Sequence, residues 1–213
     1  DEAEREFRDC GQKIKMAGCN NLRGQIWMGR GNYDSALYFH LSALAVRETT
    51  GNPIAISSSL FNLGELYNNR KEYQKALKVL NRGLRIDLAI GDLNGQSMYY
   101  YQLARANNAL NRLDSVVFFL NRSIRFATPN SAYDILQKGY LEMAGFLKKT
   151  GQPAEAIGFL EKYIIITDSL HSKQSAESIA AYEALFEVES KEKEIRLLNK
   201  DRELALADAR IRM

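Results

Sequence analysis

Catalysis and metal binding need particular side chains at particular spacings, and few segments of this sequence offer them. His171 has no second histidine, cysteine or carboxylate cluster at the spacing of metal ligands. The run Ser57-Ser58-Ser59 has no paired base that would make a nucleophile, and it is typical of the polar start of a helix. The sequence therefore predicts no catalytic residue, no metal site and no cofactor, and we expect a protein that is not an enzyme.

Cys10 and Cys19 are the two cysteines, too few for a disulfide framework or a four-ligand zinc site. On one continuous helix their nine-residue separation corresponds to about 13 Å along the axis, which is too long for a disulfide. A bond between them requires the chain to turn between the two residues. We expect two buried or half-buried free thiols, because free cysteine is among the most buried residue types.

The composition is that of an ordinary globular chain. Hydrophobic residues make up 46% and charged residues 26% of 213 positions, which is enough to bury a core. Only three prolines occur, and helix-forming residues fill the segments between glycine-marked breaks, so we expect an all-α fold. The net charge of +3 is spread along the chain without a basic face, which disfavours nucleic acid as a partner. No segment approaches the roughly eighteen apolar residues of a membrane span.

The helices that would carry a binding surface are predicted by a spacing of 40 residues between equivalent positions. One series of small residues is Gly24, Gly64, Ala104 and Ala144. A second, twelve residues later, is Ala36, Ala76, Val116 and Ala156. Four residues beyond it stand His40, Leu80, Leu120 and Leu160. Because His40 occupies a leucine position, we interpret it as a core histidine. Gly24 and Gly64 fall inside helices, where they serve close packing and form no phosphate-binding loop.

Residues 60–80 carry the repeat pattern most fully: Leu60, Leu63-Gly64, Tyr67, a turn at Asn69-Arg70-Lys71, then Tyr73, Ala76 and Leu80. This pattern resembles the tetratricopeptide repeat (TPR) family. HEAT-like repeats of similar length are the alternative, but they lack Leu-Gly-x-x-Tyr followed by Ala. Other units match less well, since Asn107 replaces the Tyr67 equivalent. The resemblance implies a right-handed superhelical solenoid of helix-turn-helix units, with a long C-terminal helix after the last unit.

We expect three parts along the chain: a helix within residues 1–16 that precedes and caps the repeats, four 40-residue units over 17–176, and a capping and linker helix over 177–213. The first helices are predicted at 17–30, 57–69, 96–110 and 132–150. The second helices are predicted at 33–50, 73–90, 113–127 and 153–168.

The TPR resemblance also implies a recognition surface, because in that family the first helices line the concave face. On it, the expected peptide-binding residues are Phe61, Glu65, Asn68, Tyr101, Arg105, Asn108, Leu141 and Lys148. In the first unit the corresponding residues are Asn21, Gln25 and Met28. In the last unit Gly145 stands at the position of Glu65 and Arg105. An equally open alternative is that Phe61 and Tyr101 only pack between repeats while Glu65 and Arg105 pair on a solvated face.

The family's carboxylate clamp is only partly matched. Asn62 stands at a clamp position, but Gln25 replaces a clamp asparagine, and uncharged residues stand where basic ones belong. Those uncharged residues are Asn21, Met98 and Gln102. A reader of chaperone tails is therefore disfavoured.

From Ser172 to Met213 the chain has neither proline nor glycine, and its alternating charges predict one long helix. Its first part, with Ile179, Tyr182, Leu185 and Phe186, is expected to dock on the last repeat. Leu197, Leu204 and Ile211 recur every seven residues, and we expect them to form a dimer seam that relays a signal. Because the heptad is weak, a solvated spacer tail remains the alternative.

The segment Tyr182 to Leu204 resembles the linker after the repeats in a class of bacterial membrane-bound sensors. In those proteins extracytoplasmic TPR units lead through a charged helix into a membrane span, then a histidine kinase or a helix-turn-helix regulator. The resemblance implies a periplasmic or extracytoplasmic sensing region, with a membrane anchor just after Met213 and a protein or peptide ligand. The alternative is a cytoplasmic TPR scaffold or peptide-responsive regulator.

Overall fold

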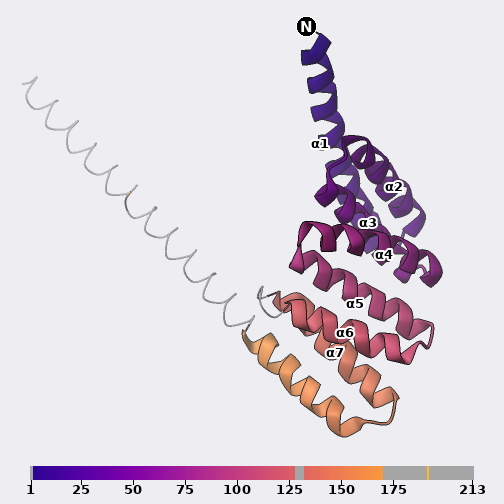
Figure 1. Ribbon diagram of the computed structural model, residues 1–213, viewed down its shortest axis with the longest axis vertical. Coiled ribbons are helices and arrows are strands. Elements are labelled where there is room, and N and C mark those ends of the chain that lie inside the picture. Colours follow the sequence, from indigo (N-terminus) through magenta and orange to yellow (C-terminus); the bar gives the residue numbers. More distant parts are fainter. Residues whose placement is uncertain (1, 128–131, 170–190, 192–213) are drawn as a thin grey trace, which may run out of the picture. The chain divides into compact units, whose positions relative to one another are not determined.

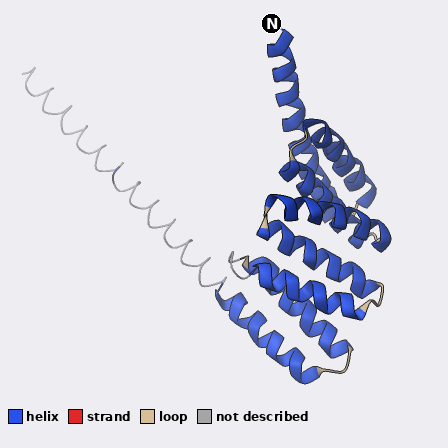
Figure 2. Ribbon diagram, in the orientation of Figure 1, coloured by secondary structure: helices blue, strands red, loops and turns tan. Residues whose placement is uncertain are grey.

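The computed structural model describes the backbone of residues 2–127, 132–169 and 191, and the side chains from residue 12 onward within those ranges. These residues form helices and no strand, so the predicted all-α fold is confirmed (Figures 1 and 2). The helices are α1 (Glu2–Gly29), α2 (Tyr33–Thr50), α3 (Pro53–Asn69), α4 (Tyr73–Ile90), α5 (Leu93–Ala109), α6 (Leu113–Ala127) and α7 (Tyr133–Lys149). Residues 153–169 are also helical.

The chain divides into two compact units, Asp1–Ile166 and Thr167–Met213, and the packing described below is that of the first. The predicted capping and linker helix of residues 177–213, including its proposed dimer seam, lies outside the described residues apart from the helical Lys191.

The second helices α2, α4 and α6 have the predicted bounds, whereas α3 and α5 begin earlier than predicted. Asn52 caps α3 by accepting a hydrogen bond from the Ala55 amide, and Pro53 occupies the first turn. Asp92 caps α5 in the same way through the Gly95 amide. Each first helix therefore starts directly after its cap, three or four residues before the expected positions 57 and 96.

The predicted N-terminal helix and the first helix of the first unit are both helical, and they form one continuous helix, α1, from Glu2 to Gly29. The chain therefore does not turn between Cys10 and Cys19. Cys19 is also exposed, contrary to expectation. It lies away from the face of α1 that packs on α2, where Asn20 donates to Ser42 Oγ over 3.0 Å.

Helices adjacent in sequence pack against each other along the whole first unit. In addition, α1 contacts α3, α3 contacts α5 and α5 contacts α7, so the first helices of successive pairs touch one another. This adjacency gives the first helices one continuous surface, which we call the first-helix surface. The helix pairs stack in chain order (Figure 1), which is the solenoid arrangement.

The small residues of the 40-residue register lie at close helix crossings. A Cβ on Gly24 would stand 2.5 Å from His40 Cε1, and one on Gly64 would overlap the Leu80 side chain. Ala36, Ala76 and Val116 have no exposed surface. Gly24 thus contacts His40, and 40 residues later Gly64 contacts Leu80, so equivalent positions touch in successive units. Leu160 departs from its series, since it is 40% exposed.

Candidate functional site

A cavity of about 340 Å³ opens on the first-helix surface, and we call it the α3–α5 pocket. Its lining residues come from α1, α3 and α5, from the C-terminal part of α4 and from the turn between α4 and α5: Gln25, Ile54, Ser57, Ser58, Phe61, Asn62, Glu65, Asp87, Asp92, Asn94, Gly95, Met98 and Tyr99. Phe61 packs edge-on against Tyr99, with 5.6 Å between ring centroids. The pocket therefore combines an aromatic wall with several carboxyl and amide groups.

A buried polar cluster forms the floor of the α3–α5 pocket. Ser57 Oγ donates to Asp87 Oδ1, and the Tyr99 hydroxyl donates to the Ser57 carbonyl oxygen over 2.6 Å. Burial raises the pKa of Asp87, and the hydrogen bond from Ser57 partly offsets that rise. Burial also raises the pKa of Tyr99. Ser57 is thus bonded to a carboxylate and a phenol at the floor of the pocket.

A second cavity of about 370 Å³, the α5–α7 pocket, is mostly polar. It is lined by Asn68, Tyr73, Arg105, Asn108, Ala109, Glu142 and Lys149. Asn68 Nδ2 donates to the main-chain oxygen and to Oε1 of Gln102, both over 3.0 Å. Asn108 Nδ2 donates to Glu142 Oε1 over 3.1 Å. These bonds hold the amides in place, and the buried Oδ1 atoms of Asn68 and Asn108 have no hydrogen-bond partner among the described residues.

Arg105, which lies on α5, links this helix to Asn69 at the end of α3. Its guanidinium donates to Gln102 Oε1 over 3.1 Å and to Asn69 Oδ1 over 3.4 Å. The same group lies 6.0 Å from the centroid of the Tyr101 ring. Arg105 is therefore held by amide oxygens and an aromatic face, in place of the pairing with Glu65 that the solvated-face alternative requires.

The structure brings together most, but not all, of the predicted binding residues. Phe61 and Glu65 line the α3–α5 pocket, while Asn68, Arg105 and Asn108 line the α5–α7 pocket. Tyr101 packs half-buried against the core near Arg105. Leu141 is 50% exposed, and neither it nor the exposed Lys148 lines either pocket. Lys149, which we did not predict, lines the second.

The prediction also missed Asp87 and Asp92, because it considered only the exposed rows of the first helices. Asp87 follows Leu80 and Leu84 on the buried face of α4. A lone carboxylate on an apolar face is a signal that could have found it.

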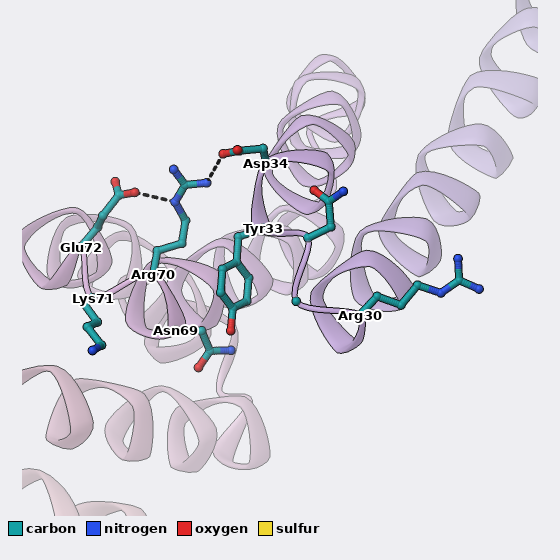
Figure 3. Close-up of a pocket in the computed structure, with 9 residues that line it drawn as sticks. Arg30, Tyr33, Asp34, Asn69, Arg70, Lys71 and Glu72 are labelled. Atoms are coloured by element: carbon teal, nitrogen blue, oxygen red, sulfur yellow. Dashed lines mark hydrogen bonds and ion pairs between the residues drawn. The ribbon is translucent and has the colours of Figure 1, made fainter.

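A third hollow, of about 680 Å³, lies at the turns between helices and is lined by Arg30, Gly31, Asn32, Tyr33, Asp34, Asn69, Arg70, Lys71 and Glu72. Figure 3 shows Arg70 between two carboxylates, with Arg30 and Lys71 pointing away from them. Arg70 Nη1 lies 2.5 Å from Asp34 Oδ1, and its Nε lies 2.5 Å from Glu72 Oε1. Both carboxylates raise the pKa of Arg70. The guanidinium is thus already paired, and it braces two neighbouring turns.

His40 is buried in the core, as the register predicted. Its Nδ1 lies 3.2 Å from Asn21 Oδ1, and its Nε2 has no partner. Burial, and secondarily the charge of Arg47, lower its pKa from 6.5 to about 4. The imidazole is therefore neutral at physiological pH.

The residues that the structure describes contain neither a metal-binding cluster nor a membrane-spanning helix. No group of three histidine, cysteine, aspartate or glutamate side chains there is arranged to hold a metal ion. None of the helices in that part of the chain is long and apolar enough to cross a membrane.

Comparison with known proteins agrees with this architecture. Residues 17–89 match the family model described as Tetratricopeptide repeat. No curated protein sequence matches the chain. Among solved structures, it resembles aspartyl phosphate phosphatase F from Bacillus subtilis with a TM-score of 0.69 and 12% identity, over 75% of this chain but only 42% of that one. The chain thus spans less than half the length of that phosphatase.

Two further solved structures cover most of both chains. BtubC from P. vanneervenii aligns with a TM-score of 0.64 and 12% identity, over 78% of this chain and 74% of that one. A protein of nearly identical TPR-like repeats from Podosopora anserina aligns with a TM-score of 0.58 and 18% identity, over 74% and 77%. At these identities the likeness concerns the fold. Residues 17–89 thus match the tetratricopeptide repeat family, and the solved structures show a TPR-like fold over about three quarters of the chain.

Proposed function

We propose that the first-helix surface binds an extended segment of a protein or peptide, with Phe61, Tyr101 and Arg105 as its main contacts. TPR units are protein-interaction modules and are generally non-catalytic, which supports a binding role. The observation that carries the proposal is the presence of two pockets lined mainly by first helices, one with an aromatic wall and one rich in amides. Aromatic and arginine side chains supply most of the binding energy where recognition occurs.

Two features of the pockets fit an extended main chain. An extended peptide presents amide and carbonyl groups along its length, and side-chain amides can bond both kinds of group. Asn108 supplies an amide from α5, and Glu142 and Lys149 supply charges from α7. Phe61 and Tyr101 are half-buried, so each is held in position while part of its ring stays accessible.

The test selects binders from a pool of capped random nonapeptides and measures their affinity by fluorescence polarisation. We expect the double variant Phe61→Ala, Tyr101→Ala to lose affinity by tenfold or more, on the order of the 1–3 kcal/mol of two anchors. Tyr38→Ala is the control, because Tyr38 is an exposed aromatic residue on α2 outside both pockets. Unchanged affinity in the double variant would place the site elsewhere.

We further propose that the chain is the sensing region of a membrane-bound bacterial signalling protein, such as a sensor histidine kinase, on the extracytoplasmic side. The resemblance of Tyr182 to Leu204 to a sensor linker supports this proposal. The proposal includes a membrane anchor after Met213 and a homodimer through Leu197, Leu204 and Ile211, with the cytoplasmic scaffold as alternative. The coding sequence on either side tests it: a leader and an apolar span are expected, and their absence would favour the scaffold.

A further inference from the structure

The α3–α5 pocket carries negative charge without a compensating cation. Glu65, Asp87 and Asp92 line it, and no lysine or arginine does. Glu65 is half-buried, and none of the described residues forms an ion pair or hydrogen bond with it. A pocket of this charge repels anionic groups and favours positive ones.

Two of these carboxylates converge on one point of the backbone. A Cβ built on Gly95 would overlap Asp87 Oδ2 and would stand 2.8 Å from Asp92 Oδ2, so both oxygens lie against the same glycine. Asp92 Oδ1 is already engaged, since it accepts from the Gly95 amide over 2.9 Å. Asp87 is only 2% exposed, with Oδ1 bonded to Ser57. Like charges this close repel each other, and a cation beside them relieves that repulsion.

A separate observation points to a ligand in the same pocket. Asn62 is only 6% exposed and lines the cavity, yet its amide has no hydrogen-bond partner in the described part of the chain. Its amide oxygen and nitrogen are not among the fully enclosed polar atoms of the described residues, so they face the open cavity, where a bound group can reach them. A ligand in the pocket can supply the missing partner, as a donor to the Asn62 carbonyl oxygen or an acceptor for its NH₂ group.

The apolar part of the wall limits the kind of cation that fits. Ile54, Phe61 and Met98 present hydrocarbon surface beside the carboxylates. Lysine and arginine carry a charged head on an aliphatic stem, so one side chain can cover this surface and reach the acids. We infer that the α3–α5 pocket receives a lysine or arginine side chain of the bound peptide, with the head held by Glu65, Asp87, Asp92 and Asn62. This inference rests on the proposed peptide-binding function.

The experiment uses the full chain and four pools of capped nonapeptides that are random except for a fixed central lysine, arginine, norleucine or glutamate. Norleucine keeps the stem of lysine and removes its charge. Retention on the immobilised protein is measured by mass spectrometry. We expect lysine- and arginine-centred peptides to be retained about fivefold or more over norleucine-centred ones, as for one partly buried charge interaction, and glutamate-centred ones least.

Glu65→Gln and Asp92→Asn test the site, because each removes a charge with little change of shape, and asparagine still caps α5. Each is expected to reduce the preference for lysine over norleucine severalfold, with retention of norleucine-centred peptides unchanged. Glu161→Gln is the matched control, since Glu161 is exposed and lines none of the pockets described above. It is expected to keep the full preference.

The outcomes separate this inference from the proposed function. Equal retention of all four pools would overturn the inference and leave peptide binding standing. A lysine preference that persists in Glu65→Gln and Asp92→Asn would overturn the assignment to this pocket. No retention of any pool by correctly folded protein would contradict the proposed function, and the inference with it.

Discussion

At the scale of single residues, a half-buried arginine and a buried aspartate occupy equivalent positions of the repeat with different consequences. Arg47 and Asp87 are 40 positions apart, and both follow a buried helix face. Arg47 donates to the Ala55 carbonyl and to Ser59 Oγ, whereas Asp87 accepts from Ser57 and lines the α3–α5 pocket. The two residues therefore stand at the same position of the repeat, but Arg47 stabilises the fold through hydrogen bonds whereas Asp87 lines a cavity.

The lowered pKa of His40 makes the stability of the protein depend on pH. The folded-state pKa of about 4 lies below the ordinary 6.5, so between these values the unfolded chain binds a proton that the folded protein excludes. Stability is therefore fully present above pH 6.5 and falls toward pH 4, by a His40 contribution on the order of 2–3 kcal/mol.

Urea unfolding at several pH values checks this prediction. His40→Leu places at position 40 the residue that its counterparts Leu80 and Leu120 have. The stability of this variant is expected to fall less steeply between pH 6.5 and 4 than that of the parent, since carboxylate titration is common to both. If the stability of the two proteins fell equally with pH, His40 would not be the group that binds a proton only in the unfolded chain.

At the scale of the helices, the glycines of the register are needed where two helices cross. Gly64→Ala places a methyl group inside the fully buried Leu80 side chain and is expected to destabilise the fold by about 1–3 kcal/mol. Gly145→Ala is the matched control within a helix, because nothing lies within 4 Å of its added Cβ. It is expected to stabilise α7 by up to about 1 kcal/mol, since alanine favours helix. Thermal melts that rank the two variants the other way would refute the register.

The accuracy of the predicted helix bounds depended on the residues at the helix ends. α2, α4 and α6 follow short turns and were located to the residue. α3 and α5 begin earlier than predicted because Asn52 and Asp92 are N-caps, so each helix starts at the residue that follows its cap. α1 was split because the repeat period begins near residue 17, while nothing in the local chemistry ends the helix there.

At the scale of the whole repeat unit, the surface was predictable but its pockets were not. Phe61, Glu65, Asn68, Arg105 and Asn108 follow from the resemblance to the TPR family, and the structure places them in two pockets. Asp87 and Asp92 enter the first pocket from α4 and from the start of α5. Their approach depends on how one helix pair packs on the next, which a one-dimensional pattern does not contain.

Binding of a peptide at the first-helix surface is tested most directly by mapping the amide chemical shifts of the protein by NMR. The lysine-centred nonapeptide retained most strongly is titrated into isotope-labelled protein. We predict that the largest shifts fall on α3 and α5, around Phe61, Asn62 and Met98, with little change on the outward positions of α2, α4 and α6. Shifts gathered on the outer helices, or at the turns around Arg30 and Lys71, would contradict the claim.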